Sequence, residues 1–340
     1  MSAARFFYLV TADSRFRMAD ETPLAFLQRR MFRRGTRVPT GGVKVIYQHC
    51  DALVAAGIEA HPVHLGDFRV DWMEHHCRPL GLAEALELAT PDDVLVVPER
   101  VPEAGAGFSC RRRVAFVQNG GLVDKALGGR DYGDFGFTDV LCCSRWLGAF
   151  MASRTRLPVH VAVNGIDLSK FRPAPKKRRV GRVLYLKRKA TWEYGRAALA
   201  KLDPAVRAGI EVVELPNRMS EAEMIAAYQS ADIFLALGFP EGFALPPLEA
   251  MACGAAVVGF AGGGGLEHMV DGESALVVAD GDADGLAAAL ARVVADRDLH
   301  ERLRAGGLAM ASRFGLPRMA GEVVAMARLP GGGKNAGGGG

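Results

Sequence analysis

The sequence lacks the features that mark membrane-spanning, secreted and disulfide-stabilised proteins. No apolar run approaches the roughly 18 residues that a transmembrane helix needs. The N-terminal stretch MSAARFFYLVTADSRF is too short and too polar for a signal peptide. None of the six cysteines forms a CxxC pair, and a chain of 340 residues without a disulfide framework is typical of a reduced compartment. We therefore expect a cytoplasmic protein.

The excess of one charge sign is also small. Lysine and arginine total 42 against 38 aspartate and glutamate residues, which gives a net charge of +4. No nucleic-acid recognition module is present, so this balance favours anionic small ligands or an anionic surface and not nucleic acid. With 49% apolar and 24% charged residues, the composition is typical of a globular protein with two hydrophobic cores.

The sequence does contain a repeated alternation of short apolar runs and amphipathic segments of helix length. Runs such as RFFYLV at residues 5–10 and DVLVV at residues 93–97 are typical of buried parallel strands. The alternation restarts after the Pro- and Lys/Arg-rich stretch VNGIDLSKFRPAPKKRR. We expect an α/β protein with two doubly wound Rossmann-like domains that face each other across a cleft.

The linker and the tail set the expected domain bounds. We place the N-terminal domain at residues 1–168, with an insert at 14–37, and the C-terminal domain at 169–314. A helix at 315–329 is expected to pack back on the N-terminal domain, and the glycine-rich residues 330–340 to form a flexible tail. Further strands are expected at 60–65, 113–117, 139–143, 180–186, 211–215, 232–237, 256–260 and 275–278, and helices at 43–57, 80–89, 144–154, 192–201, 220–229, 247–253 and 284–314.

Two glutamates stand out in FPEGFALPPLEAMACG, residues 239–254. Glu241 and Glu249 are separated by seven residues, and Pro247 suits the first position of a helix. We therefore expect Glu249 in the first helical turn and Glu241 on the preceding loop. Amides at a helix start attract phosphate, whereas each ionised carboxylate can accept two hydrogen bonds from a vicinal diol. A diol on each side of a diphosphate describes a nucleotide sugar.

EGFALPPLEAMACG resembles the signature of the retaining nucleotide-sugar glycosyltransferases of family 4, which have the GT-B fold. The resemblance extends over residues 163–172 and 231–272 and over the closing helices. It implies that Glu241 holds the hydroxyl groups of the donor sugar and that Glu249 holds the ribose. It also implies a donor-binding set that comprises Gly242, Phe243, Ala244, Leu245, Leu215 and Asn217.

Three adjacent cations, Lys187-Arg188-Lys189, follow the strand expected at 180–186. The family has an Arg and a Lys in this region, several residues apart, that neutralise the departing diphosphate. We assign Arg188 as a bidentate clamp and Lys189 as a point charge, which together with Glu241 form the predicted catalytic set. A solvated basic strand end is the alternative interpretation.

Gly41-Gly42 opens the first long helix, where the family has a turn that brings backbone close to the donor phosphate. In the family this turn directly follows the first strand, whereas residues 14–37 intervene here. That insert contains PLAFLQRRMFRRGTR, which mixes large apolar side chains with arginines. Residues 24–37 are either a basic amphipathic segment that contacts the inner face of the membrane or covers an anionic acceptor, or a solvated helix packed on the domain.

Gln118 and Asn119 end the strand expected at 113–117 and are predicted to face the cleft. Many relatives place a histidine from this region near the reacting sugar, and here neutral amides would position the donor or the acceptor. A simple turn before Gly120-Gly121 is the alternative.

Two other patterns resemble metal sites. His61-x-x-His64 and His75-His76-Cys77 each lack a second ligand pair, and Asp280-x-Asp282-x-Asp284 stands where a strand leads into a helix, which favours an N-cap. We expect no metal and no cofactor apart from the nucleotide-sugar donor.

These patterns predict a retaining, metal-independent glycosyltransferase. It would move a sugar from a nucleoside-diphosphate sugar to a hydroxyl of a glycan or lipid-linked acceptor, in glycan, polysaccharide or glycolipid synthesis. The resemblance implies retention, with the leaving phosphate deprotonating the acceptor on the same face. The alternative is a non-catalytic GT-B partner subunit that binds nucleotide sugar. A phosphorylase would need a pyridoxal-binding lysine motif, and epimerases of this fold lack the glutamate pair.

Overall fold

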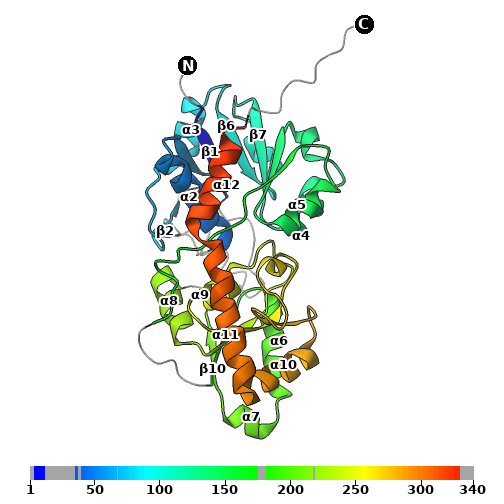
Figure 1. Ribbon diagram of the computed structural model, residues 1–340. Helices are drawn as coiled ribbons and strands as arrows, with labels where there is room; N and C mark the ends of the chain where they lie inside the picture. The colour runs from blue at the N-terminus through cyan, green and yellow to red at the C-terminus, as the bar shows by residue number, and fades with distance from the viewer. Residues whose placement is uncertain are drawn as a thin grey trace. The chain divides into compact units, whose positions relative to one another are not determined.

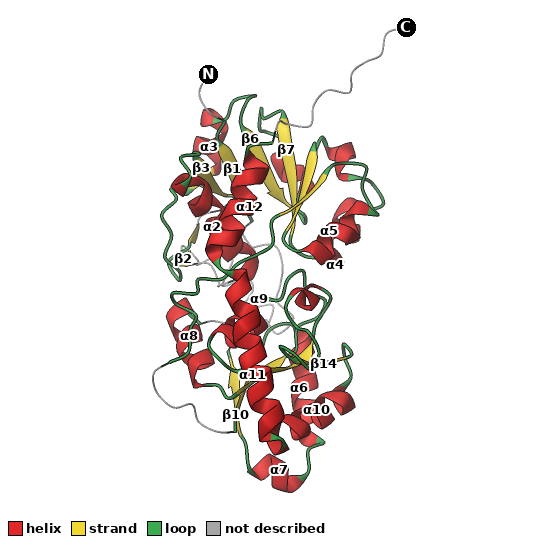
Figure 2. Cartoon of the chain, viewed as in Figure 1, coloured by secondary structure: helices red, strands yellow, loops and turns green. Residues whose placement is uncertain are grey.

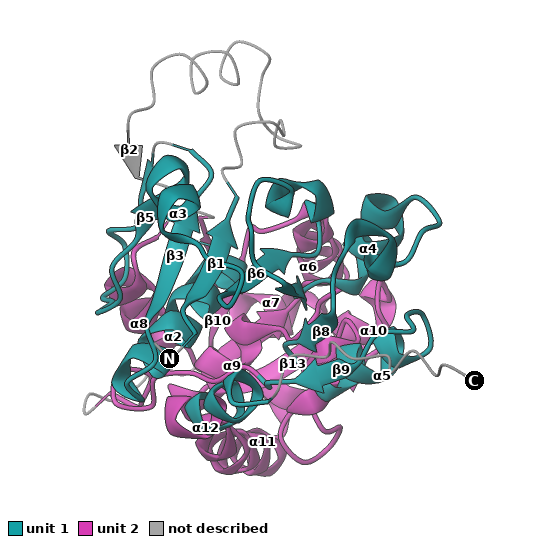
Figure 3. Cartoon of the chain, turned by 90° about the horizontal axis from the view of Figure 1, so that it is seen from above, with its two compact units in different colours: residues 1–163, 320–340 teal, residues 164–319 magenta. Residues whose placement is uncertain are grey.

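The computed structural model of the chain describes residues 4–11, 35–36, 40–66, 68–174, 181–216 and 219–329. The chain divides into two compact units, coloured separately in Figure 3: residues 1–163 with 320–340, and residues 164–319. The insert at 14–37, apart from Gly35–Thr36, and the tail at 330–340 lie outside the described residues. Their expected structures stay predictions, as do the domain bounds given above.

The first unit is built on a parallel sheet of seven strands in the order β5-β3-β1-β6-β7-β8-β9. Figure 2 labels β3, β1, β6 and β7 of this sheet. Every residue of β1 is buried, because helices cover both faces of such a sheet. A separate two-stranded sheet pairs β2 with β4. The strands are β1 (Phe6–Val10), β2 (Gly35–Thr36), β3 (Ala60–His64), β4 (Phe68–Arg69), β5 (Leu80–Gly81), β6 (Val94–Pro98), β7 (Arg112–Val117), β8 (Asp139–Cys142) and β9 (Val159–Val161).

Helices of the first unit pack on the strands that precede or follow them. Helix α2 lies on β1 and β3, α3 on β3 and β5, and α5 on β8 and β9. The helices are α2 (Gly41–Ala55), α3 (Leu82–Leu88), α4 (Gly120–Leu127) and α5 (Arg145–Ala152). The last helix, α12 (Leu316–Ala327), ends in this unit, where Glu322 accepts a hydrogen bond from the Val163 backbone N–H at 2.6 Å. Arg112 of β7 likewise donates to the Leu329 carbonyl at 2.9 Å.

The second unit has a parallel sheet of five strands in the order β11-β10-β12-β13-β14. Figure 1 labels strand β10 of this sheet. Its strands are β10 (Arg182–Leu186), β11 (Glu211–Leu215), β12 (Ile233–Ala236), β13 (Ala256–Phe260) and β14 (Leu276–Val278). Its helices are α6 (Glu193–Ala200), α7 (Pro204–Ala208), α8 (Glu221–Ser230), α9 (Leu245–Ala252), α10 (Ala283–Ala295) and α11 (Arg297–Ala311).

Alternation along β12 shows how this sheet is covered on both faces. Ile233 and Leu235 join a core that includes Leu199 of α6 and Leu286 of α10. Phe234 points to the other face, where it meets Tyr228 of α8 edge-on with ring centroids 5.5 Å apart. The predicted fold class, an α/β protein with two doubly wound parallel sheets, is therefore confirmed.

Some element predictions were wrong, and local sequence explains them. The segment expected as one helix at 80–89 begins with strand β5, because Leu80–Gly81 pairs with β3 before the helix starts. Helix α4 was missed, although Asn119 caps it, because two glycines open it. Helix α7 was missed, although Asp203 caps it and Pro204 occupies its first turn. The strands expected at 211–215 and 256–260 have the predicted bounds.

Within the described residues, no helix combines the length and apolar character needed to cross a membrane. The six cysteines are buried free thiols.

Candidate functional site

The candidate site of the second unit lies where strand connections reverse direction. From β10 the chain moves to β11 on one side of the sheet, and it then returns to β12 on the other side. Ligands of open α/β sheets bind at such a switch point, beyond the carboxyl ends of the strands. The residues that follow β10 are Lys187, Arg188 and Lys189, and the loop that follows β12 contains Glu241. Topology therefore brings the predicted cations and the predicted carboxylate together.

Glu241 forms ion pairs with both cations assigned to the catalytic set. Arg188 Nη2 lies 2.5 Å from Glu241 Oε1, and Lys189 Nζ lies 2.9 Å from the same oxygen. The Lys189 ammonium also donates to the Pro240 carbonyl at 2.6 Å. All three side chains are partly or largely buried, with exposed fractions of 32%, 30% and 12% for Arg188, Lys189 and Glu241.

This burial makes the charges interdependent. Burial disfavours ionised Glu241, but the charges of Arg188 and Lys189 outweigh it and hold the pKa of the Glu241 carboxyl below its ordinary value. Burial lowers the pKa of Lys189, and the Glu241 carboxylate opposes that shift. Lys187 points elsewhere, since its ammonium lies 3.5 Å from Glu214 and over the Trp192 ring. The structure thus separates Arg188 and Lys189 from the third cation.

Backbone strain is concentrated at the same place. Among the described residues, Lys189 and Ala244 are the two non-glycine residues with positive φ, at 60° and 61°. Such conformations cost about 1–3 kcal/mol each and cluster at functional sites. Lys189 begins the turn after β10, and Ala244 is the residue from which helix α9 starts.

The Gly-rich turn after β13 packs directly beneath the Glu241 loop. Glu241 N–H donates to the Gly262 carbonyl at 2.7 Å, and Gly264 N–H donates to the Glu241 carbonyl at 2.9 Å. A Cβ at Gly264 would lie 2.1 Å from the Gly242 carbonyl carbon, and one at Gly262 would lie 2.6 Å from the Gly238 carbonyl oxygen. Only glycine fits these positions. The close contact between the two backbone segments therefore fixes the position of the Glu241 loop.

Helix α9 begins two residues earlier than expected. Leu245 is its first residue, so both prolines fall in the first turn, where a missing N–H costs nothing. Glu249 consequently lies in the second turn and not in the first. Its side chain is buried, and its residue is 6% exposed. Burial, and next the nearby Glu249 charge, raise the pKa of Tyr228.

The remaining donor-binding candidates differ in their location and burial. Phe243, Ala244 and Leu245 are buried in the turn that leads into α9, and Leu215 is buried at the end of β11. Gly242 lies in the same loop as Glu241, and Asn217 lies outside the described residues. His268 is packed between the Phe243 and Phe314 rings, and burial lowers its pKa to about 3 although the Ala244 backbone favours the charged form.

In the first unit, the structure brings together the predicted residues of two segments. Helix α2 begins at Gly41, as expected, and a Cβ at Gly42 would lie 3.3 Å from the Gln118 side-chain oxygen. Asn119 caps α4, because its side-chain oxygen accepts a hydrogen bond from the Gly121 N–H at 3.0 Å.

Sequence reasoning missed Glu99, which follows β6 at the switch point of the first sheet. Its residue is 4% exposed. Burial raises the pKa of its carboxyl to about 7, although backbone N–H groups of Glu99, Gln118 and Asn119 favour the ionised form. An acidic residue directly after the apolar run VLVVP was the signal that could have revealed it.

The residues that resembled metal sites have other partners. His61 bonds to the Arg78 carbonyl and to Glu59, each at 2.9 Å. Asp282 caps α10 by accepting from the Gly285 N–H at 2.8 Å, as expected, and Asp280 accepts from the Gly262 N–H at 3.1 Å. Over the described ranges, no three His, Cys, Asp or Glu side chains are arranged to hold a metal ion.

Comparisons with known proteins point to one family. Residues 205–309 match the family model described as "Glycosyl transferases group 1", which includes Glu241, Glu249 and the Gly-rich turn. Over these residues the chain is similar to the group 1 glycosyltransferases. D-inositol 3-phosphate glycosyltransferases from Geodermatophilus obscurus and Saccharomonospora viridis are 29% identical over 205 residues and 38% identical over 116 residues. These matches cover 47% and 33% of this chain, and 45% and 26% of those relatives. The chain spans about half or less of the length of the curated relatives it matches.

Solved structures show the fold of the chain. HepE from Anabaena, in complex with UDP and glucose, has a TM-score of 0.71 and 14% identity, and the alignment covers 95% of this chain and 99% of HepE. Sucrose-phosphate synthase from Thermosynechococcus elongatus has a TM-score of 0.68 and 18% identity, with 96% and 98% covered. The fold is GT-B.

Proposed function

We propose that this chain is a retaining glycosyltransferase that moves a sugar from a nucleoside-diphosphate sugar to an acceptor hydroxyl group. The observation that carries the proposal is the Glu241 carboxylate, held by Arg188 and Lys189 at the switch point of the second sheet. Burying paired charges on strained backbone lowers the stability of the folded protein, and such destabilising features are typical of ligand-binding sites.

The geometry of Glu241 suits a role in holding the donor sugar. Arg188 and Lys189 both bond to Oε1, and no hydrogen bond from the described residues reaches Oε2. Oε2 is therefore assigned to accept hydrogen bonds from sugar hydroxyls, while the two cations fix the carboxylate in place. Glu249 is assigned to the ribose. The backbone of Gly242, Phe243, Ala244 and Leu245 is assigned to the sugar and diphosphate, with Leu215 and Asn217 completing the donor-binding set.

In the proposed reaction, the bond between the anomeric carbon and the diphosphate oxygen breaks. The acceptor oxygen bonds to the same face of that carbon, and the acceptor proton passes to the leaving phosphate. Arg188 and Lys189 stabilise the negative charge that develops on the diphosphate. Because the chain supplies these cations itself, we propose that turnover does not depend on a metal, and activity should survive EDTA.

On the acceptor side, we propose roles for residues of the first unit. Gly41 and Gly42 would let backbone approach the donor phosphate, and Gln118 with Asn119 would position the donor or the acceptor hydroxyl. The proposed acceptor is a glycan or a lipid-linked molecule, and the proposed location is the cytoplasm, with residues 24–37 contacting the membrane peripherally.

The test is a panel of UDP- and GDP-sugars, read first as a shift in melting temperature. UDP-glucose belongs in the panel because HepE binds it. A binding donor stabilises the folded protein by RT ln(1 + [L]/Kd), so 100 Kd of donor adds about 2.7 kcal/mol. We expect one donor to raise the melting temperature, and the purified protein to hydrolyse or transfer its sugar.

Glu241→Gln provides the specific variant, and Glu273→Gln, an exposed glutamate of the same unit, is the matched control. We expect the first to weaken donor binding and abolish turnover and the second to change neither. A donor that binds but is neither hydrolysed nor transferred would favour the non-catalytic partner subunit. Absence of binding by every nucleotide sugar would overturn the proposal.

A further inference from the structure

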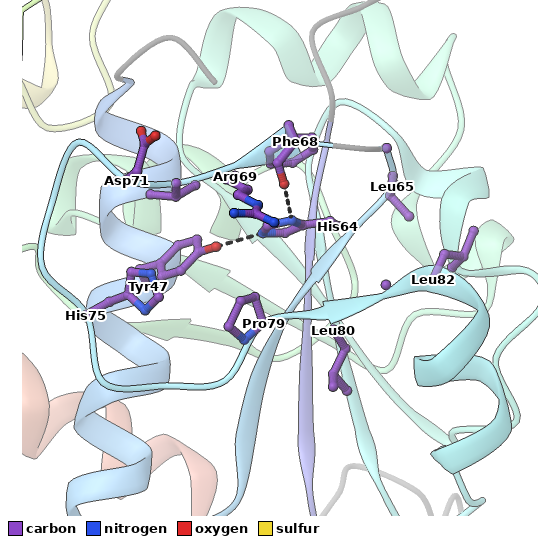
Figure 4. A pocket seen from close by; sticks show the side chains of 13 residues that line it. Tyr47, His64, Leu65, Phe68, Arg69, Asp71, His75, Pro79, Leu80 and Leu82 are labelled. Atoms are coloured by element: carbon purple, nitrogen blue, oxygen red, sulfur yellow. Dashed lines mark hydrogen bonds between the residues drawn. The ribbon is translucent and has the colours of Figure 1, made fainter. Parts of the chain in front are cut away.

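The first unit contains a cavity of about 640 Å³ that none of the roles above uses (Figure 4). This volume falls in the range of small-molecule binding sites, roughly 300–1,000 Å³. Its walls come from α2, from strands β3, β4 and β5, and from the loop between β4 and β5. The described lining residues are Tyr47, His64, Leu65, Gly66, Phe68, Arg69, Val70, Asp71, His75, Pro79, Leu80, Gly81 and Leu82.

The polar side chains of the inner wall are bonded to the protein. His64 Nδ1 lies 2.9 Å from the Phe68 carbonyl oxygen, which can only accept, so this nitrogen carries the proton. When the ring is neutral, Nε2 accepts the Tyr47 hydroxyl hydrogen at 2.6 Å, the bond drawn in Figure 4. His75 Nδ1 bonds to the Cys77 carbonyl at 3.2 Å.

Aromatic packing turns these residues into apolar surface. The His64 ring stacks on Phe68 with centroids 4.2 Å apart, and the Tyr47 ring packs on His75 at 4.6 Å. Together with the lining leucines, they form a largely apolar wall that offers a ligand few hydrogen-bonding groups. A sugar ring buried there would lose hydration of its hydroxyl groups without regaining equivalent bonds.

One cation is available on this wall. Arg69 is exposed, and within the described parts of the chain it forms no ion pair. Asp71 is the one carboxylate among the described lining residues, and Figure 4 shows it pointing away from the Tyr47–His64 pair. Arg69 can therefore receive an anionic group of a ligand.

The apolar surface continues outside the cavity along α3. Leu82 lines the cavity and is 37% exposed, and Leu86, one helical turn further on, is 38% exposed. Exposed leucines in a row extend the apolar contact available to a ligand longer than the cavity.

We propose that this cavity binds an anionic amphiphile: its apolar body packs on the aromatic and leucine wall, and its phosphate or carboxylate head pairs with Arg69. Binding itself does not depend on the proposed transferase activity. The further assignment of this amphiphile as the acceptor or its carrier does rest on that activity.

The experiment uses geranyl phosphate and 1-naphthyl phosphate as probes on the full chain, measured by calorimetry. Geraniol provides the same body without the charge, and glucose 1-phosphate provides the charge with a polar body. We expect both amphiphiles to bind, geraniol to bind more weakly, and glucose 1-phosphate to give no saturable binding. The two amphiphiles also distinguish a chain-like ligand from a flat aromatic one.

Two variants assign the binding to this cavity. Arg69→Gln should weaken geranyl phosphate binding at least tenfold, the effect of losing a charge-assisted bond, and leave geraniol unchanged. Leu82→Gln should weaken the binding of both geranyl phosphate and geraniol severalfold. Arg111→Gln and Leu88→Gln, at exposed positions of the same unit outside the cavity, are the matched controls and should bind as the parent protein does.

The proposal is overturned if neither amphiphile binds, if glucose 1-phosphate binds as tightly, or if Arg69→Gln and its control behave alike. Stabilisation by the nucleotide sugar is measured in parallel. If no nucleotide sugar stabilises the parent protein, the proposed transferase activity is rejected, and the proposal of amphiphile binding is unaffected. If neither amphiphile binds while a nucleotide sugar still stabilises the protein, only the proposed function of the cavity is rejected.

Discussion

The two sheets have the same doubly wound architecture, but their switch points carry different chemistry. In the second unit, cations that follow β10 meet a carboxylate that follows β12, and Glu241 is ionised because Arg188 and Lys189 surround it. In the first unit, Glu99 follows β6 and is buried, and its pKa rises to about 7. The same topology thus yields a fixed charge cluster in one unit and a titratable acid in the other. The charged residues of the second site could be assigned from the sequence, whereas the raised pKa of Glu99 follows from its burial in the folded protein.

Gly264→Ala tests most severely whether the glycine turn supports the second site. The new Cβ would lie 2.1 Å from the Gly242 carbonyl carbon, a contact between backbone segments that no rotamer can relieve. We expect about 3–5 kcal/mol of destabilisation. Hydrogen exchange should show lost protection at residues 238–264 and retained protection in β1 and β6. Gly321→Ala on α12, where a Cβ meets nothing within 4 Å, is the control and should not destabilise the protein, because alanine favours a helix more than glycine does. Equal melting temperatures for the two variants would contradict the proposal that the glycine turn supports the Glu241 loop.

Arg188→Gln tests the charge cluster itself. The substitution removes a cation assigned to the developing diphosphate charge, and loss of one such donor typically lowers kcat about 100- to 1,000-fold. We expect that loss in kcat with the fold intact, together with a rise in the Glu241 pKa. Arg196→Gln serves as the control, because Arg196 is exposed and pairs with Glu214 in the same unit. An unchanged kcat would leave the ion pair as a structural contact only.

The sequence supported a correct prediction of much of the second unit, for physical reasons. Strand β11 and helix α8, which the structure shows to begin with a Ser220–Glu223 capping box, follow from local patterns that tertiary packing did not override. The motif around Glu241 likewise depends on short-range backbone geometry, which the prolines and glycines encode. The ion pair between Arg188 and Glu241 joins residues 53 positions apart, and only the strand order places them together.

The first unit was harder to predict because its features depend on long-range contacts. The pKa of Glu99 is set by burial beneath other chain segments, which no local pattern specifies. The cavity beside Arg69 is lined by β4 and β5 together with Tyr47 of α2, and both strands have only two residues. Residues 14–34 lie outside the described residues, so the predicted contact of this insert with a membrane or acceptor stays a prediction.

Glu99→Gln examines the titratable acid of the first unit. Its ordinary pKa is 4.5 and its pKa in the folded protein is about 7, so the folded state retains a proton that the unfolded state has lost between these values. Stability is therefore lost as pH rises from about 4.5 through 7, by about 3 kcal/mol at pH 8. The neutral amide avoids this penalty. Glu99→Gln should melt at a higher temperature than the parent protein at pH 8, and the difference should vanish at pH 4.

The control for this prediction is Glu103→Gln, because that glutamate is exposed and follows Glu99 in the same loop region. It should show the parent pH profile. If Glu99→Gln and the parent protein have parallel profiles between pH 4 and 8, the Glu99 carboxyl titrates normally and the contrast between the two switch points disappears.

Asn119→Ala has the smallest expected effect and decides between two roles of one side chain. Its oxygen accepts the Gly121 N–H at 3.0 Å, so alanine should cost about 1 kcal/mol through loss of the α4 cap. Asn119→Asp keeps an oxygen acceptor at the cap and should restore the melting temperature, because a carboxylate also interacts favourably with a helix N-terminus. If Asn119 also contacts the acceptor or donor through its amide N–H, the Asp variant will be as stable as the parent protein yet transfer more slowly. If transfer recovers together with stability, Asn119 acts only as a cap, and Gln118 beside Gly42 remains the amide assigned to the reaction.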